Sequence, residues 1–176
     1  MVQTITAQPL TRENFAEFGE VIELGGDNHF SINNGNGERY HALAAADVTG
    51  PNARVLISIV SSKEYAVPLK VPMVERHPFG SQAFIPMSPG SFILVVCPDD
   101  GNGPGAPRAF FTKPGQGVNY SRNLWHGILT PIGKPQNFIV VDRGGDGNNL
   151  EEFFFPEPYE IHLPIHYQAQ ISGGEE

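Results

Sequence analysis

The sequence contains few of the features that would mark a disulfide-bonded, membrane-spanning or nucleic-acid-binding protein. One cysteine, Cys97, cannot form a disulfide within the chain, and its apolar neighbours predict a small buried side chain. No apolar run approaches the ~18 residues of a membrane-spanning helix, and no charged and apolar leader opens the chain. Lys and Arg number 11 against 19 Asp and Glu and form no cluster, which argues against a polyanionic partner. We therefore expect a cytoplasmic protein that binds neither nucleic acid nor a membrane.

Glycine and proline, by contrast, are abundant, and they favour short strands over helices. The 176 residues include 20 glycines and 16 prolines, both of which interrupt helices and mark turns. Apolar, often branched runs predict strands at 55–60, 82–87, 92–96, 109–112, 118–120, 126–130, 138–141 and 152–155. Turn residues separate them at intervals of roughly ten residues, which is typical of a β-sandwich or barrel. We predict a single domain over residues 1–176, with a polar tail at 164–176.

One helix is predicted near the N-terminus. Thr11 can cap it, and Glu13 suits the positive end of the helix dipole. Phe15 and Phe18 share one face of such a helix, and Gly19 can end it in a left-handed conformation.

Two of the six histidines stand at strand entrances beside other polar residues. In the double-sheet jelly-roll barrels called cupins, one motif carries two histidines and a glutamate, and a later motif adds a third histidine. Glu75, His77 and Gln82 occupy the first-motif positions, and His126 occupies the second. We therefore predict a mainly β, cupin-like double-sheet jelly-roll barrel with a short N-terminal helix.

These four residues support two alternatives. Imidazole and carboxylate bind transition metals well, so His77, His126, Glu75 and Gln82 can hold a divalent ion. The neutral glutamine oxygen makes such a site weaker than one with three histidines. In a metal-free pocket, the same residues would serve as hydrogen-bond donors, acceptors and bases. The sequence leaves both alternatives open.

Other polar segments lie outside these motifs. The glycine-rich segment 32–41 is typical of a solvated loop, although Arg39 can bind a small carboxylate through two parallel hydrogen bonds. Asp142 and Arg143 end a buried strand and are interpreted as a structural ion pair. His162 and His166 are expected at the surface or in an interface.

Three segments of the chain resemble the ureidoglycolate lyase family, also called ureidoglycolate hydrolase. They are residues 30–41 (FSINNGNGERYH), 74–87 (VERHPFGSQAFIPM) and 116–129 (QGVNYSRNLWHGIL), supported by VDRGG at 141–145. The resemblance implies a cupin-type homodimer that cleaves (S)-ureidoglycolate to glyoxylate and urea in allantoin catabolism. It also implies a divalent metal, nickel in some descriptions.

The chain departs from one pattern of that family, His-Arg-x-x-Trp-His-His. Here Ser121 and Gly127 replace the first and last of these histidines. Two imidazoles near the site are thus absent, which weakens the metal assignment and leaves a metal-free site as an alternative.

The carbinolamide chemistry of the small anionic substrate suggests a role for each candidate. The catalytic candidates are His77 and His126, as acid and base, and Glu75, which would tune them. The candidates for substrate binding are Arg39, Asn34, Gln82, Asn119 and Tyr120. The dimer contact is expected to include Glu160 to Tyr167. Alternative functions are another small-molecule cupin enzyme, an isomerase or lyase, or a ligand-binding cupin without catalysis.

Overall fold

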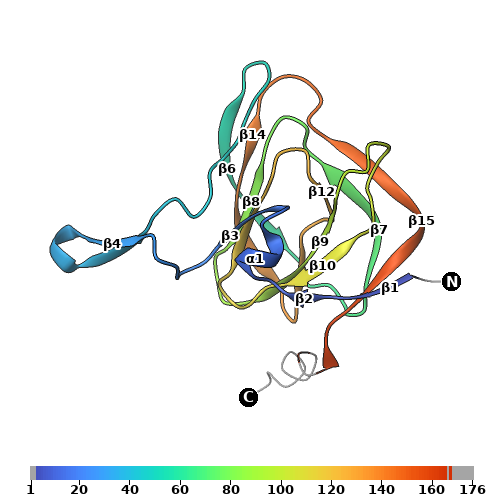
Figure 1. Ribbon diagram of the computed structural model, residues 1–176, viewed down its shortest axis with the longest axis horizontal. Coiled ribbons are helices and arrows are strands. Elements are labelled where there is room, and N and C mark those ends of the chain that lie inside the picture. Colours follow the sequence, from blue (N-terminus) through green and yellow to red (C-terminus); the bar gives the residue numbers. More distant parts are fainter. Residues whose placement is uncertain (1–2, 166, 168–176) are drawn as a thin grey trace.

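The computed structural model describes residues 3–165 and 167, which form a barrel of two β-sheets (Figure 1). The larger sheet has eight strands in the order β1-β15-β7-β12-β9-β10-β2, with β13 also paired to β9. The smaller sheet has five strands in the order β3-β11-β8-β14-β6. The predicted mainly β, cupin-like double-sheet barrel is therefore confirmed.

The element bounds are as follows. The larger sheet contains β1 (Gln3–Thr6), β2 (Gln8–Pro9), β7 (Leu69–Arg76), β9 (Ser91–Cys97), β10 (Arg108–Phe111), β12 (Trp125–His126), β13 (Thr130–Ile132) and β15 (Glu151–His162). The smaller sheet contains β3 (Gly19–Ile22), β6 (Arg54–Ser62), β8 (Gln82–Pro86), β11 (Gly117–Tyr120) and β14 (Gln136–Gly144). A separate hairpin pairs β4 (His29–Ile32) with β5 (Gly37–Tyr40) through the 3-10 turn η1 (Asn33–Gly35).

Side-chain alternation along the strands defines the main core. Successive residues of a strand point to opposite faces of its sheet. The inward-facing residues of four strands are even-numbered and buried: Phe84, Phe92, Leu94, Val96, Val118, Tyr120, Phe138 and Val140. Cys97 has the opposite parity and is buried in a smaller cluster, as predicted, and burial raises its pKa to about 12. The same parity identifies the side chains that face inward at the strand ends.

The helix α1 (Arg12–Phe15) lies across the front of the barrel in Figure 1. Thr11 caps it as predicted, because its hydroxyl accepts from the Asn14 N–H while the Asn14 side chain accepts from the Thr11 N–H. Phe15 belongs to the main core. The helix is a single turn, and Gly19 does not end it. Gly19 lies in β3, where a Cβ atom would collide with the carbonyl oxygen of Asn119.

Two strand predictions differ most from the observed strands in extent. The predicted strand at 126–130 is broken between β12 and β13, where Gly127 donates to the Val95 carbonyl instead of continuing a ladder. The strand predicted at 152–155 continues to His162 as β15, although Pro156 and Pro158 cannot donate to a ladder. A register shift between Phe154 and Tyr159 accommodates these prolines.

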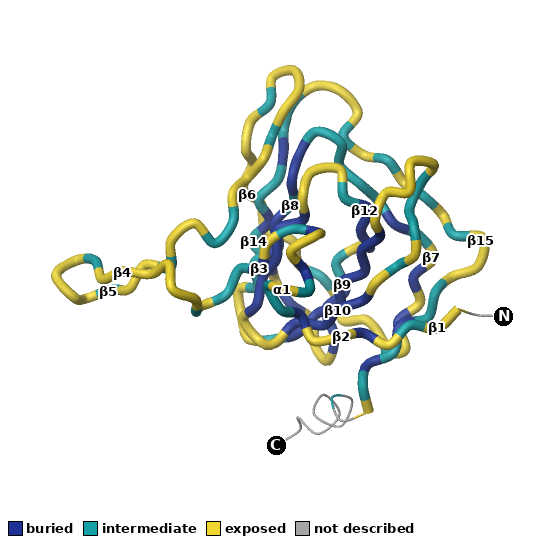
Figure 2. The backbone as a smooth tube through the Cα atoms, in the orientation of Figure 1, coloured by how far each residue is buried: buried dark blue, intermediate teal, exposed yellow. Residues whose placement is uncertain are grey.

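The hairpin of residues 29–40, called the arm below, projects from the barrel on the side of β3 and β6 (Figure 1). Its residues are exposed or half-buried along their whole length (Figure 2). Asn33 and Asn34 adopt positive φ values of 55° and 56° at its tip, where asparagine tolerates the left-handed conformation. Within the described chain, no helix has the length and hydropathy of a membrane span.

Candidate active site

A carboxylate and two imidazoles meet where β7 ends beside β12. Glu75 stands directly opposite His126 in the antiparallel pairing of these strands. Residues two apart in an extended segment share a face, which brings His77 to the same side as Glu75. One ligand atom from each of the three residues lies within 4.8 Å of the other two. Two motifs about fifty residues apart in the sequence are thus joined by one strand pairing.

The other face of the same strands carries a different pair. The guanidinium carbon of Arg76 lies 4.3 Å from the ring centroid of Trp125. Arg76 also forms ion pairs with Asp99 and Glu151. Strand alternation therefore separates this outer cation from the inner cluster.

His126 is a buried, neutral imidazole. Its Nδ1 lies 3.0 Å from the Gly127 carbonyl oxygen, to which it donates, so the lone pair is on Nε2. This buried Nε2 has no partner among the described residues. Burial lowers the pKa of His126 to about 3, and the Gly127 hydrogen bond opposes that effect only partly. His126 is therefore an acceptor or a metal ligand at neutral pH, rather than an acid.

His77 is oriented in the same way by a different carbonyl group. Its Nδ1 lies 2.8 Å from the Asn149 carbonyl oxygen and donates to it. The Nε2 atom is buried without a described hydrogen-bond partner and lies 3.8 Å from Oε1 of Glu75. The ring centroids of His77 and His126 are 5.3 Å apart. Both imidazoles therefore present a bare Nε2 toward the cluster.

Glu75 contributes a carboxylate with altered acidity. Burial raises its pKa, His77 opposes the increase, and the charge of Glu152 adds to it. A raised pKa makes the ionised group a stronger base than an exposed glutamate.

The smaller sheet adds Gln82 and Tyr120 to the cluster. Both side chains face into the barrel, as the even-numbered core residues of the same strands do. The two residues are paired across β8 and β11. The Oε1 atom of Gln82 is buried and lacks a described partner. The Tyr120 ring stacks on His126. Burial raises the pKa of the Tyr120 hydroxyl, and the charge of Glu75 raises it further.

Asp142 also belongs to the cluster, although the sequence had suggested a structural ion pair with Arg143. The two side chains leave β14 on opposite faces. Arg143 donates instead to the carbonyl groups of Thr49, Pro51 and Asp146. Burial raises the pKa of Asp142, while His77 and a hydrogen bond from Gln82 lower it. The sequence could have indicated this, because Asp142 lies two and four residues from Val140 and Phe138 and therefore shares their face of the strand.

Three predicted substrate-binding residues lie away from the cluster of their own chain. Asn119 has outward parity, and its Nδ2 donates to Glu20 Oε2 and the Ala45 carbonyl. Asn34 and Arg39 are exposed on the arm. A separate hollow lined by Val71, Met73, Val95 and other residues contains no histidine or carboxylate.

The cluster has the donor set of a divalent metal site. Glu75, His77 and His126 offer one carboxylate oxygen and two imidazole nitrogens, which suit first-row transition metals. Each Nδ1–H is fixed by a backbone carbonyl, an arrangement that orients histidine ligands. Buried polar atoms without partners are costly, and a bound ion would satisfy both Nε2 atoms.

Comparison with known proteins identifies the relatives of this chain. A family model described as ureidoglycolate lyase matches residues 2–162. The chain belongs to the ureidoglycolate lyase family. It is 69% identical over 160 residues to a ureidoglycolate lyase of Mesorhizobium japonicum, covering 91% of this chain and 98% of that protein. It is 61% identical over 163 residues to one of Chelativorans sp., covering 93% and 99% respectively. A third relative, ureidoglycolate lyase 2 of Rhizobium meliloti, is 53% identical over 154 residues, or 88% and 94%.

Ser121 and Gly127, which replace two histidines of the family pattern, each follow a residue of the cluster and lie just outside the described strands. Ser121 is exposed and follows inward-facing Tyr120. Gly127 follows His126, and a Cβ atom there would lie 3.3 Å from Cβ of Val95, which faces away from the main core. The metal-containing and metal-free alternatives of the sequence analysis both stay predictions.

Proposed function

We propose that this chain is a lyase that cleaves (S)-ureidoglycolate to glyoxylate and urea, a reaction of allantoin catabolism. One observation carries the proposal: two buried imidazole Nε2 atoms without described hydrogen-bond partners converge with a carboxylate oxygen of Glu75. Membership in the ureidoglycolate lyase family names the substrate class that fits them.

The reaction needs one proton to move. The reacting carbon of ureidoglycolate bears a hydroxyl, a carboxylate and a urea nitrogen. The hydroxyl loses its proton as its oxygen forms the carbonyl of glyoxylate. The carbon–nitrogen bond breaks, and the departing urea nitrogen takes a proton. Because the hydroxyl loses one proton and the urea nitrogen gains one, a group that carries this single proton from oxygen to nitrogen is sufficient. We call such a group a proton relay.

We propose that Glu75 and His77 form that relay. Their facing atoms are 3.8 Å apart, and burial makes Glu75 a better proton acceptor. We assign removal of the hydroxyl proton and its return to nitrogen to this pair. His126 remains neutral because its pKa is low, so it accepts a hydrogen bond or ligates a metal.

The remaining residues position the substrate. Gln82 holds the Asp142 carboxylate, and its free Oε1 can accept from a urea N–H group. The Tyr120 hydroxyl faces the same side of the cluster and can donate to a substrate oxygen. These assignments place hydrogen-bonding groups around the relay.

In the metal-containing alternative, a divalent ion would be held by His77, His126 and Glu75, with the Gln82 oxygen as a weaker fourth ligand. His77 and Glu75 would then serve as ligands instead of forming the proton relay. When bound, such an ion supplies Lewis acidity, which lowers the pKa of a hydroxyl group that it contacts. The family resemblance suggests nickel, and the imidazole-rich donor set is compatible with it.

We also propose a homodimer formed through β6. This strand pairs only with β14 in the described structure and leaves Val55, Ile57 and Ile59 exposed at 47%, 78% and 65%. A long apolar edge strand is a template for association. The segment Glu160 to Tyr167 is a weaker candidate, because Ile161 is buried in its own chain; His166 lies outside the described residues. The expected cytoplasmic location stays a prediction.

The decisive assay measures glyoxylate released from each enantiomer of ureidoglycolate, detected by coupled reduction. Purified protein should exceed the spontaneous rate shown with heat-inactivated protein, and only with one enantiomer. The assay should be repeated after chelation and after restoring Ni²⁺. Binding without turnover would support the non-catalytic alternative. Failure with both enantiomers, with and without metal, would exclude the proposed activity.

A further inference from the structure

The arm has no support from its own barrel beyond its root. Strands β4 and β5 pair only with each other among the described strands. The root is closed by Asn28 and His41, which exchange a backbone hydrogen bond of 2.9 Å and a side-chain one of 2.8 Å. An isolated two-stranded hairpin is marginally stable in water. Phe30, 46% exposed near the root, adds an apolar surface that water does not favour. The arm therefore needs a surface to pack against.

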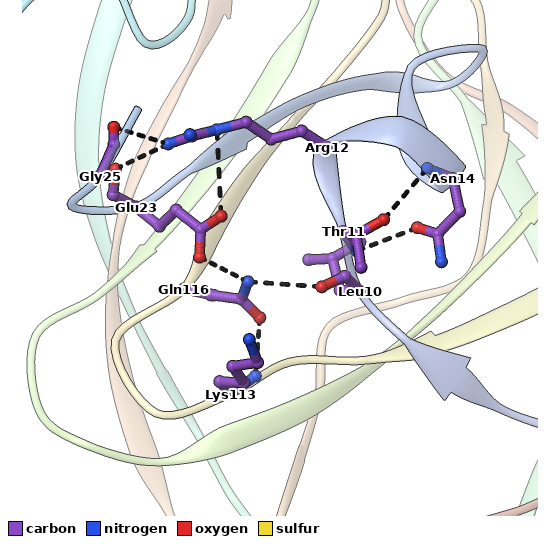
Figure 3. A network of polar contacts seen from close by, with 8 residues as sticks. All are labelled: Leu10, Thr11, Arg12, Asn14, Glu23, Gly25, Lys113 and Gln116. Carbon is purple, nitrogen blue, oxygen red and sulfur yellow. Dashed lines mark hydrogen bonds and ion pairs between the residues drawn. The ribbon is translucent and has the colours of Figure 1, made fainter. Parts of the chain in front are cut away.

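Both legs of the arm are tied to the barrel, which holds it away from its own cluster. On the first leg, the Arg12 guanidinium donates to the carbonyl groups of Glu23 and Gly25 (Figure 3). The Glu23 carboxylate in turn accepts from Gln116 at 2.7 Å. On the second leg, Asp47 pairs with Arg122 at 2.9 Å. Figure 1 shows the arm projecting on the side opposite β7, which carries Glu75.

Among the described residues of its own chain, the cluster has no free cation. Neither Glu75 nor Asp142 has a described arginine or lysine among the charges that shift its pKa. The nearby Arg76 and Arg143 use their guanidinium groups on other partners. The substrate class carries a carboxylate, which a guanidinium binds best. Arg39 on the arm is exposed, and its side chain forms no hydrogen bond or ion pair with any described residue.

The edge strand β6 gives a short path from the outside to the cluster. β14, which carries Asp142, is the only described strand that pairs with β6, and Asp142 lies opposite Leu56 of β6. Neighbouring strands are about 4.8 Å apart, so a molecule seated on β6 lies one strand from Asp142. The arm and β6 project on the same side of the barrel in Figure 1. An interface on that side therefore includes both.

We propose that a second copy of this chain packs against β6 and that the arm of each copy delivers Arg39 to the cluster of the other. The guanidinium would bind the substrate carboxylate, so each complete site contains residues of two chains. A two-fold interface presents the same surfaces on both subunits, which lets both arms cross at once. The substrate role of Arg39 rests on the proposed function, whereas the arm contact does not.

Heterodimers test the exchange directly. The Arg39→Ala and His126→Gln variants carry different affinity tags and are allowed to form dimers together. The dimer that carries both tags is then purified. Exchange leaves one site intact, so turnover should return to about half of the wild-type dimer, while each homodimer stays nearly inactive. A heterodimer of Lys134→Ala with His126→Gln is the matched control, because it contains one intact site in either arrangement. Recovery equal to this control supports exchange. No recovery beside an active control overturns it.

A second measurement does not depend on turnover. Because Asn28 and His41 are already bonded, residues 29–40 can be replaced by an Asn-Gly turn. Removing the arm contact should weaken the dimer at least about tenfold in Kd by analytical ultracentrifugation. The thermal midpoint of the isolated barrel should change little. An unchanged Kd overturns the inference even if ureidoglycolate is cleaved. A weakened dimer in a protein with no lyase activity supports the arm contact and rejects only the proposed substrate.

Discussion

The ring of Tyr120 lies almost flat against the ring of His126, with centroids 4.3 Å apart and planes inclined by 13°. This stack, together with the hydrogen bond from His126 to the Gly127 carbonyl, determines where the bare Nε2 points. The tyrosine therefore has two separable properties, an aromatic face that packs on the imidazole and a hydroxyl that we propose donates to the substrate.

Two substitutions separate those properties. Tyr120→Phe keeps the stack, so its thermal midpoint should stay within a few degrees while kcat/KM falls about tenfold. Tyr120→Leu removes the stack and should lower both the midpoint and kcat much further. Steady-state kinetics and thermal unfolding on the same preparations check this. Identical behaviour of the two variants would show that the stack does not orient His126.

Asp142→Asn keeps the shape of a side chain that faces His77 but removes its charge. We expect kcat to fall by about 10²-fold, because the carboxylate and Gln82 surround the proton relay. Asp146→Asn is the matched control, since that exposed carboxylate belongs to a surface turn and accepts from Asn52. Equal activities of the two variants would remove Asp142 from the site.

Metal binding should depend on both imidazoles and should be visible without substrate. Added Ni²⁺ is expected to raise the thermal midpoint of chelator-treated protein, because an ion that binds only the folded state stabilises it. His77→Ala should abolish most of that increase, whereas His29→Ala, on the exposed arm, should not. An undiminished increase in His77→Ala would place the metal elsewhere.

The pKa of His126 predicts acid sensitivity. Its value is about 3 in the folded chain against an ordinary 6.5, so below pH 6.5 the unfolded chain binds a proton that the folded chain does not. The free energy of unfolding should therefore fall as the pH drops through this window, by about 1.4 kcal/mol per pH unit from this group. Above pH 6.5 the contribution is constant.

Urea unfolding of metal-free protein between pH 8 and pH 5 measures that slope. For His126→Gln, the free energy of unfolding should depend less steeply on pH than for the parent, by an amount that corresponds to nearly one bound proton. The exposed His41→Gln variant should keep the parental slope. Parallel curves for parent and His126→Gln would mean that the buried imidazole is protonated in the folded state.

The apolar edge of β6 should control the oligomeric state. Ile57→Glu places a charge at the centre of its exposed face and should give monomers at micromolar concentration by light scattering. Ile165→Glu is the control, because Ile165 is 87% exposed within the rival segment Glu160 to Tyr167. A monomeric Ile165→Glu variant beside a dimeric Ile57→Glu variant would reverse the assignment.

Local patterns were enough to predict the barrel and the two histidines. Branched apolar runs and regular turns predicted most strands, and each histidine preceded or followed a recognisable strand. The short helix was overestimated, since Gly19 serves the close approach of β11 rather than a helix end. Helix length depends on what the first turn packs against, and that information is not local.

The composition of the site was harder to predict, because strand pairing decides which side chains face the interior and meet there. Asp142 and Arg143 are neighbours in sequence, and only the burial of Phe138 and Val140 shows which of the two faces inward. Arg39 and Asn34 were grouped with the site by composition, yet the barrel holds the arm away from it. Asp142 and Arg143 are neighbours in the sequence, but the strand points them to opposite faces. Glu75 and His126 are far apart in the sequence, but the register of β7 and β12 brings them together.

The pairing of Glu75 with His126 ties the chemistry to a single alignment of β7 and β12. Sliding either strand by one residue would turn one ligand outward and bring Trp125 or Arg76 in its place, because side chains alternate with a period of two. A partly misaligned barrel can keep its sheets but not this constellation. Lyase activity is therefore a sensitive measure of correct folding. When the protein refolds from urea, lyase activity should therefore return together with the slowest phase in which native β-sheet forms.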